Sequence, residues 1–322
     1  MDSSSPGNAN RGHVYRHHVR DEERGATVLA LYVARFTHTD ESTWRARIAE
    51  GSVRLNGRVA EAEWVVRAGD ELAFHRAPWV EPDAPREFGV VFEDEHVLAI
   101  DKPSGLQVLP AGPFTDATLL TLVRESAPDR ADASPIHRLG RGTSGVVLFG
   151  KTFLARAALA KQFRDFHPRK TYLAVTDAPR TSDFTLPRSA LQPIGTVPHG
   201  PMRLWVACAG GKPSKTRLRI VARDRAGRLL VAAQPITGRA DQIRIHLAAC
   251  GVPIAGDLLF GVGGVAKSDV TPGRGGYRLH ATALAFTHPA SGRSVKLRCL
   301  PRWSELADFV RAPAARSLRC AP

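Results

Sequence analysis

A glycine-rich segment at residues 135–145 combines two arginines with hydroxyl side chains in the order Pro-Ile-His-Arg-Leu-Gly-Arg-Gly-Thr-Ser-Gly. Glycines allow a backbone to approach a ligand closely and to adopt positive φ. Arg138 and Arg141 are suited to holding phosphates, because a guanidinium offers several donors to such oxygens. The apolar run 146–149 predicts a buried strand that anchors the end of this loop. An ordinary turn with two exposed arginines is the alternative that composition alone allows.

A second segment, residues 237–247, places a carboxylate and a guanidinium three residues apart, at Asp241 and Arg244. That spacing allows the two side chains to touch on a helix. An arginine binds a carboxylate bidentately and keeps its charge, whereas a buried arginine without a counter-ion is costly. We therefore expect Arg244 to pair with a carboxylate, and Asp241 is the first candidate.

Tyr172 stands in the β-rich run Lys-Thr-Tyr-Leu-Ala-Val at 170–175, after an amphipathic segment that predicts a helix over about 153–166. An aromatic ring can serve as a platform for an unstacked nucleobase. A tyrosine on a strand is more often a core residue than a ligand. Its position alone therefore favours the core.

The chain of 322 residues carries 45 Lys and Arg against 31 Asp and Glu, for a formal net charge of +14. Such a surface attracts polyanions and favours an RNA partner over a basic surface kept for solubility. The four cysteines are scattered, and no metal-binding, dinucleotide-binding or phosphate-loop motif occurs, so we expect no metal and no organic cofactor. No apolar run is long enough to cross a membrane. We expect a cytoplasmic monomer without a membrane partner.

Changes in composition divide the chain into five parts. Residues 1–25 are polar and predict a disordered basic tail, and residues 26–76 predict a small unit of two helices and tight turns. Three prolines within residues 77–86 predict an extended linker. Short strands alternate with a few helices over 87–302, which predicts an α+β domain around a mixed, largely antiparallel sheet. Residues 303–322 predict a C-terminal tail with a short helix.

Three segments carry a resemblance to a known family. Residues 135–145 resemble the signature His-Arg-Leu-Asp-x-x-Thr-Ser-Gly of the RluA-type RNA pseudouridine synthases. Residues 170–172 resemble that family's Lys-x-Tyr motif, and 237–247 resemble its Thr-Gly-Arg-x-His-Gln-Ile-Arg-x-His-Leu run. The likeness extends from about residue 26 to 302 and implies the pseudouridine synthase fold.

The resemblance implies an isomerase that converts uridine to pseudouridine in ribosomal or transfer RNA. Tyr172 would pack on the target uracil, and Arg244 would pair with the catalytic carboxylate. Further residues are implied to bind the RNA: His137, Arg138, Arg141, Thr143 and Arg239.

The small N-terminal unit resembles the alpha-L RNA-binding domain. It has two predicted helices followed by Gly-x-Val-x-x-Asn-Gly and x-x-Gly-Asp, with Asn56-Gly57 as a tight-turn signal. That resemblance implies phosphate contacts from Arg45, Arg47 and Arg54. A solvated basic face is the alternative.

Two positions depart from the family pattern, because Gly140 stands where the catalytic aspartate is expected and Asp241 stands where histidine is expected. A plant-type branch of the family also reads His-Arg-Leu-Gly-Arg-Gly-Thr-Ser-Gly, and this chain is similar to that branch. One hypothesis is that Asp241 has taken over the carboxylate role. Three more aspartates could do so: Asp101, Asp132 and Asp257. The alternative hypothesis is a catalytically impaired member that binds RNA without isomerising it.

Overall fold

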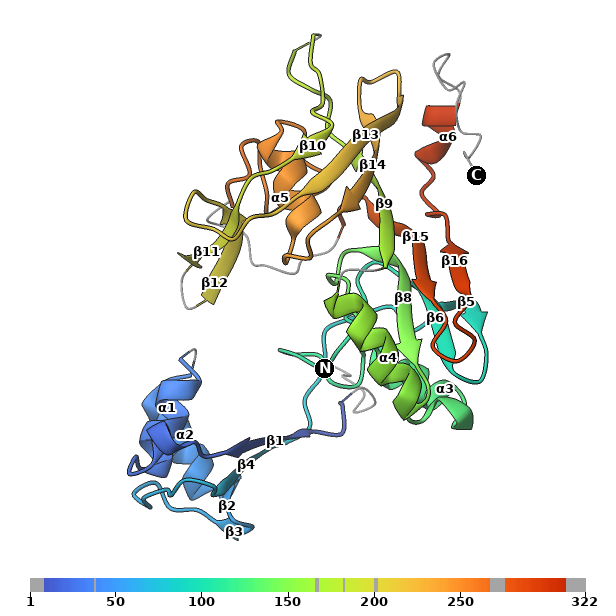
Figure 1. Ribbon diagram of the computed structural model, residues 1–322. Helices are drawn as coiled ribbons and strands as arrows, with labels where there is room; N and C mark the ends of the chain where they lie inside the picture. Colours follow the sequence, from blue (N-terminus) through green and yellow to red (C-terminus); the bar gives the residue numbers. More distant parts are fainter. Residues whose placement is uncertain are drawn as a thin grey trace, which may run out of the picture. The chain divides into compact units, whose positions relative to one another are not determined.

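The computed structural model of the chain describes residues 9–37, 39–165, 168–181, 183–199, 202–266 and 276–310. These residues form two compact units (Figure 1). The described residues of the first unit lie within Met1–Pro82 and Ala111–Asp116, and those of the second lie within Asp83–Pro110 and Ala117–Pro322.

The first unit packs two short helices on a small antiparallel sheet with the strand order β1-β4-β2-β3. Both helices begin at a capping side chain, since Thr27 accepts from the Ala30 N–H and Asp40 accepts from the Thr43 N–H. Trp44 is buried in the core between these elements. The elements are β1 (His13–His18), η1 (Asp21–Glu23), α1 (Val28–Arg35), α2 (Glu41–Ala49), β2 (Val53–Leu55), β3 (Arg58–Val59) and β4 (Glu71–Arg76).

The N-terminal tail differs from the expectation for residues 1–25, because residues 13–18 form β1 along the whole of β4. The strand has few apolar residues, which is why its composition suggested disorder. Pairing with β4 supplies its backbone hydrogen bonds, and Tyr15 stacks on Phe74 with ring centroids 5.9 Å apart. A tertiary partner has thus overridden local composition.

The proline-rich segment 77–86 is also more ordered than a tether. Within the first unit, Glu81 is buried and accepts hydrogen bonds from Asn10 and Thr115. The indole of Trp79 donates to the carbonyl of Pro113 at 2.8 Å. The unit therefore ends within the expected linker, and it takes in the short excursion 111–116 from later in the chain.

The second unit is built on a ten-stranded sheet, and its path runs β10-β13-β14-β9-β15-β8-β6-β5. β16 pairs with β15 and β7 with β8, and β15–β8 is the parallel pair among otherwise antiparallel ones. The predicted mixed, largely antiparallel sheet is therefore present. Its strands are β5 (Gly89–Glu93), β6 (Val97–Lys102), β7 (Ser134–Pro135), β8 (Ser144–Gly150), β9 (Arg169–Thr176), β10 (Ser189–Ala190), β13 (Thr216–Arg223), β14 (Leu229–Pro235), β15 (Leu279–Thr287) and β16 (Ser294–Arg298).

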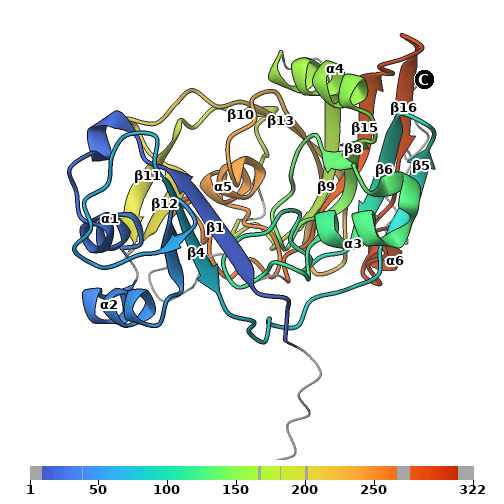
Figure 2. The same ribbon diagram turned by 90° about the horizontal axis from the view of Figure 1, so that it is seen from below.

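The helices cover different parts of this sheet. α4 packs on β8 and β15, while α5 lies against β13, β14 and the separate hairpin β11–β12 (Figure 2). These remaining elements are α3 (Leu119–Ser126), η2 (Pro128–Arg130), α4 (Phe153–Arg164), β11 (Ile194–His199), β12 (Met202–Ala207), α5 (Gln242–Ala249) and α6 (Leu306–Val310). No helix in the described part of the chain is long and apolar enough to cross a membrane.

Two details of the second unit bear on the expectations from sequence. Gly145 is required where β8 meets β15, because its φ is +107° and an added Cβ would lie 2.4 Å from the Ala281 carbonyl oxygen. The expected C-terminal tail over 303–322 begins with order, since α6 buries Phe309 against Val175 and Leu230. Residues 311–322 lie outside the described residues.

Candidate active site

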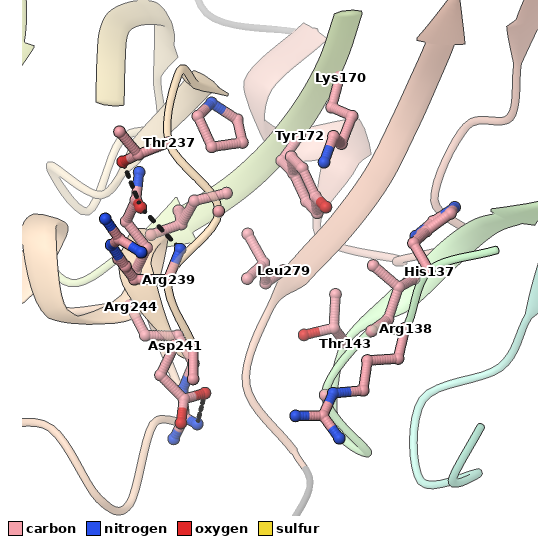
Figure 3. Close-up of a pocket in the computed structure, with 17 residues that line it drawn as sticks. His137, Arg138, Thr143, Lys170, Tyr172, Thr237, Arg239, Asp241, Arg244 and Leu279 are labelled. Carbon is pink, nitrogen blue, oxygen red and sulfur yellow. Dashed lines mark hydrogen bonds and ion pairs between the residues drawn. The ribbon is translucent and has the colours of Figure 1, made fainter. Parts of the chain in front are cut away.

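A cavity of about 410 Å³ opens in the second unit, where segments far apart in sequence meet (Figure 3). Its walls come from the loop before β8, the middle of β9, the loop before α5 and the start of β15. Most of the predicted site residues line it: His137, Arg138, Gly140, Thr143, Tyr172, Arg239, Asp241 and Arg244. Arg141 is not among the lining residues.

Backbone hydrogen bonds hold the loop that carries Gly140. The Thr143 N–H donates to the Gly140 carbonyl at 3.0 Å and closes a turn. The buried ammonium of Lys102 donates to the carbonyls of Leu106 and Arg141, at 2.6 and 3.2 Å. The hydroxyl of Ser104 donates to the Gly142 carbonyl at 2.7 Å. These contacts preorganise the cavity wall.

Arg244 is a buried cation held between two carboxylates. Its Nε and Nη2 donate to the two oxygens of Asp257 at 2.7 and 2.9 Å. Its Nη1 donates to Oδ1 of Asp241 at 2.6 Å. Burial acts to lower the pKa of Arg244, but the hydrogen bond with Asp257 and the charges of both carboxylates outweigh it and raise that pKa. Arg244 therefore stays charged at any pH where the protein is folded.

Asp241 lies at the rim of the cavity, and its side chain is 31% exposed. Its backbone is left-handed, with φ +51°, at the residue before α5. Asp is one of the residues that tolerate this conformation, but it remains uncommon outside glycine. The carboxylate does not cap the helix. It is turned instead toward Arg244 and the cavity (Figure 3).

The other candidate aspartates are placed differently, since none of the three lines the cavity. Asp257 is buried, and Arg244 engages both of its oxygens, while the N–H groups of Leu259 and Phe260 add two further hydrogen bonds to Oδ1. Asp132 is exposed. Asp101 belongs to a separate group with His280 and Cys299. The geometry favours Asp241 for the carboxylate role.

Asp101, His280 and Cys299 bring potential metal-binding atoms within 4.8 Å of one another. His280 has no nitrogen left for a metal ion, because its Nδ1 contacts the Ser144 hydroxyl at 2.8 Å and its Nε2 contacts the Cys299 carbonyl at 3.0 Å. These contacts orient the ring between β8 and β15. The arrangement fits a structural hydrogen-bond cluster better than a metal centre.

Tyr172 projects from β9 into the cavity opposite the Asp241 loop (Figure 3). Burial raises the pKa of Tyr172 to about 12, so its phenol is neutral at physiological pH. The ring also packs against two hydrophobic clusters, one that contains Leu279 and one that contains Leu139. Tyr172 is thus a half-buried residue that belongs to the core and also lines the cavity, and its role as a platform for a base stays a prediction.

His137 is half-buried and stacks on Phe163, with ring centroids 4.8 Å apart. Burial, followed by the charge of Lys170, lowers the pKa of His137 to about 3. Its Nε2 accepts the Leu148 N–H at 3.2 Å, as a neutral ring can. His137 therefore supports the cavity wall as a neutral side chain and offers RNA no positive charge.

Gln242 is a positioning residue that sequence reasoning did not single out. Its side-chain oxygen accepts from the Thr237 hydroxyl at 2.7 Å and from the Arg239 N–H at 3.0 Å. Its amide nitrogen donates to the Lys215 carbonyl and the Thr216 hydroxyl, both at 2.9 Å. The loop before α5 is thereby tied to β13. Its place in the matched 237–247 run is the one signal that could have found it.

Arg239 and Arg138 are two cations of the cavity lining that make no ion pair among the described residues. The Nε of Arg239 is buried and lacks a hydrogen-bond partner among the described residues. Arg138 is exposed, and it makes no ion pair within the described ranges. Such groups favour an anionic ligand, because unmet donors in a cavity are costly.

The predicted phosphate-binding arginines of the first unit all have intramolecular partners. Arg45 pairs with Glu63 at 2.9 Å and with Glu41 at 3.3 Å. The guanidinium of Arg47 lies over the rings of Trp44 and Phe74. Arg54 donates to the carbonyl of Gly57 in the adjoining turn. Their RNA contacts remain a prediction.

The chain is similar in sequence to known proteins over most of its length. The family model for RNA pseudouridylate synthase matches residues 96–249. The chain is 38% identical over 273 residues to an uncharacterized RNA pseudouridine synthase of Synechocystis, covering 84% of this chain and 92% of that protein. It is 32% identical to RNA pseudouridine synthase 5 of Oryza sativa, covering 89% and 86%. It is 34% identical to the dual-specificity RNA pseudouridine synthase RluA of Yersinia pestis, covering 65% and 97%.

A solved structure shows the same fold. The human protein RNA Pseudouridylate Synthase Domain Containing 1 aligns with a TM-score of 0.55 at 24% identity, covering 71% of this chain and 89% of that one. This likeness confirms the predicted fold class.

Proposed function

Because the chain belongs to the RluA-type RNA pseudouridine synthase family, we propose that it isomerises uridine in ribosomal or transfer RNA and that Asp241 supplies the carboxylate. One observation carries the second part of this proposal. Asp241 is the one acidic residue among the described residues that line the cavity, and Arg244 holds its Oδ1 at 2.6 Å. The comparisons do not support a member that binds RNA without isomerising it, since these relatives are named as synthases.

The reaction breaks the bond between uracil N1 and ribose C1′ and forms a bond between C5 and C1′. One proton leaves C5 and one is gained at N1, so the nucleotide keeps its formula. The uridine must leave the RNA stack to be reached, as other base-modifying enzymes require. A cavity of about 410 Å³ lined by Tyr172 can receive it.

Asp241 and Tyr172 occupy complementary positions for this chemistry. A carboxylate stabilises the electron-poor sugar carbon that forms when the base departs, as in glycoside hydrolysis. Arg244 holds Asp241 in place, because its Nη1 donates to Oδ1 of the carboxylate at 2.6 Å. Tyr172 offers its ring as a platform on which the detached uracil can stay while it turns. Arg138 and Arg239 would meet the neighbouring phosphates.

The proposal is tested by release of tritium from ribosomal and transfer RNA transcripts labelled at uridine C5. We expect wild type to release tritium and to form pseudouridine. Asp241→Asn should lower kcat by at least about a hundredfold, because it removes charge that acts in the reaction. RNA affinity should change little. Asp132→Asn, at an exposed position outside the cavity, is the matched control.

Two outcomes would contradict the proposal. Full activity of Asp241→Asn would remove Asp241 from the reaction. Tight binding of structured RNA by wild type without pseudouridine, together with turnover by Gly140→Asp, would instead identify an impaired member that binds RNA.

A further inference from the structure

A second cavity, of about 370 Å³, lies beside the active-site cavity on the same sheet. The two cavities share three lining residues, namely Lys170, Pro235 and Thr237. A ligand that fills the first cavity and continues past these residues therefore enters the second. None of the reaction steps above uses this second cavity.

The second cavity is basic. Arg169 projects from β9 and Arg217 from β13, and both are exposed. With Lys170 they give three cations, and no aspartate or glutamate appears among the described residues of its lining. Neither Arg169 nor Arg217 forms an ion pair in the described part of the chain, whereas Arg45 and Arg228 do. Uncompensated cations in a hollow attract an anion.

Polar residues follow one another across three neighbouring strands, namely Arg217, Gln234 and Thr171. Arg217 on β13 is the register partner of Gln234 on β14. Gln234 in turn donates to the Thr171 hydroxyl on β9 at 3.3 Å. Because sheet strands hold neighbouring residues at fixed spacing, the register places Arg217 beside Gln234 at the cavity.

Apolar groups complete the second cavity. The Phe163 ring lies 5.0 Å from the Lys170 ammonium and stacks on His137, so it forms part of the wall between the cavities. Ile236 also lines this cavity and is 42% exposed. Cations beside an aromatic ring and an aliphatic side chain suit a nucleotide, which carries a phosphate and a flat base.

We propose that this second cavity binds the nucleotide of single-stranded RNA next to the target uridine, with Arg169 and Arg217 on its phosphodiester. The proposal rests on the proposed function, because it takes the uridine to occupy the first cavity. The neighbouring nucleotide is covalently joined to that uridine, and it meets a basic hollow directly across Lys170, Pro235 and Thr237. The cavity thus contacts the RNA chain on one side of the modified base.

The test compares Arg217→Ala and Arg169→Ala with Arg219→Ala. Arg219 is the matched control, because it is an exposed arginine of the same strand that lines neither cavity. Affinity is measured by fluorescence anisotropy with labelled oligouridylates of one, three and nine nucleotides, at several salt concentrations. KM and kcat are measured by tritium release from ribosomal and transfer RNA.

We expect Arg217→Ala and Arg169→Ala each to weaken binding of the three- and nine-nucleotide probes by about fivefold or more, and uridine monophosphate binding much less. Each should also reduce the salt slope, which is the steepness with which the logarithm of the binding constant falls with the logarithm of salt concentration. The expected reduction is about 0.7, the value for one phosphate contact on a single strand. KM should rise while kcat stays near that of wild type. Arg219→Ala should leave all these quantities nearly unchanged.

Three outcomes would overturn the proposal. In the first, the cavity variants behave like Arg219→Ala. In the second, inorganic phosphate abolishes the affinity difference between wild type and the cavity variants at concentrations that leave the first cavity free, which identifies a free-anion site. In the third, kcat falls without a change in KM or salt slope. A reduced salt slope in the cavity variants would support the RNA subsite even if wild type showed no turnover. Failure of the proposed reaction can therefore be distinguished from failure of the proposed subsite.

Discussion

The hydroxyl of Tyr277 lies directly against residue 140, so that a Cβ added to Gly140 would stand 3.1 Å from that oxygen. Tyr277 is buried, its ring centroid is 4.3 Å from the Cζ of Arg244, and its hydroxyl is 3.1 Å from the Thr143 hydroxyl. Burial raises the pKa of Tyr277, so the phenol is neutral. A polar side chain from the segment that leads into β15 therefore fills the space beside the position where the family carries its aspartate. Glycine at 140 and tyrosine at 277 form a matched pair.

This pairing predicts that Gly140→Asp is poorly tolerated while Tyr277 is present. A contact of 3.1 Å is closer than ordinary packing, and Tyr277 is fixed by Arg244 and Thr143. We expect Gly140→Asp to lower the free energy of unfolding by about 1–2 kcal/mol, a typical cost of overpacking. Urea denaturation followed by tryptophan fluorescence would measure it.

The control is a double-mutant cycle with Tyr277→Phe, which removes the hydroxyl and keeps the ring. Phenylalanine alone should cost about 1 kcal/mol through loss of the hydrogen bond to Thr143. In that background Gly140→Asp should cost about 1 kcal/mol less than in wild type, a coupling typical of residues in contact. Equal costs in the two backgrounds would show that the two positions are independent.

Arg244 should be required for stability as well as for the reaction. Arg244→Lys keeps one positive charge but cannot reproduce the three hydrogen bonds to Asp257 and Asp241. Because Asp257 is buried, we expect a loss of about 3 kcal/mol in the free energy of unfolding. Asp241→Asn, at a partly exposed position, should cost less than about 1 kcal/mol. A stability loss in Arg244→Lys no larger than that in Asp241→Asn would contradict the buried-pair interpretation.

Most of the site could be predicted from the matched motifs of the sequence. The loop around Gly140, the strand of Tyr172 and the helix of Arg244 do line one cavity. These three segments could be predicted because each one matches a family motif that is short and continuous in the sequence. The Asp241–Arg244 contact could be predicted for the same reason, since both residues lie within one helical turn.

Contacts between distant segments could not be predicted in this way. Asp257 takes two of the three hydrogen bonds of Arg244, although it lies thirteen residues further along the chain. Tyr277 meets Thr143 across 134 residues. An aromatic residue before a strand resembles any core residue, so no local pattern distinguishes one that approaches a catalytic position. Only the sheet pairing of β15 with β8 and β9 brings it there.

The order of the proline-rich segment 77–86 also depends on contacts with residues that are distant in sequence, as Glu81 shows. Oε1 of Glu81 accepts hydrogen bonds from Asn10, from the N–H and hydroxyl of Thr115, and from the Asp116 N–H, at 2.6–2.9 Å. Glu81→Ala should cost about 3 kcal/mol in the free energy of unfolding, because it leaves several buried donors unmet.

Two controls accompany this variant. Glu81→Gln keeps an acceptor oxygen and should lose only about 1 kcal/mol. Glu63→Ala removes an exposed carboxylate that pairs with Arg45, and it should leave stability nearly unchanged, because exposed ion pairs contribute little. Equal stability of Glu81→Ala and Glu63→Ala in urea would show that the segment is a plain tether.

Stability of the second unit should fall as the solution is made acidic, through His137. Burial and the charge of Lys170 lower the pKa of His137 to about 3, whereas an unfolded histidine has a pKa of about 6.5. As pH falls below about 6.5 the unfolded state takes up the proton first, so stability present at neutral pH is lost progressively toward pH 3. Between pH 7 and pH 5 we expect a loss on the order of 1–2 kcal/mol from this residue.

The measurement is the difference in urea stability between pH 7 and pH 5 for wild type and His137→Asn. Asparagine can still accept the Leu148 N–H, but it does not titrate, so its pH difference should be smaller by that amount. His75→Gln, at an exposed histidine of the first unit, controls for general effects of histidine removal. If His137→Asn lost stability between pH 7 and pH 5 as steeply as wild type, His137 would be protonated in the folded protein. The interpretation of His137 as a neutral side chain of the cavity wall would then be wrong.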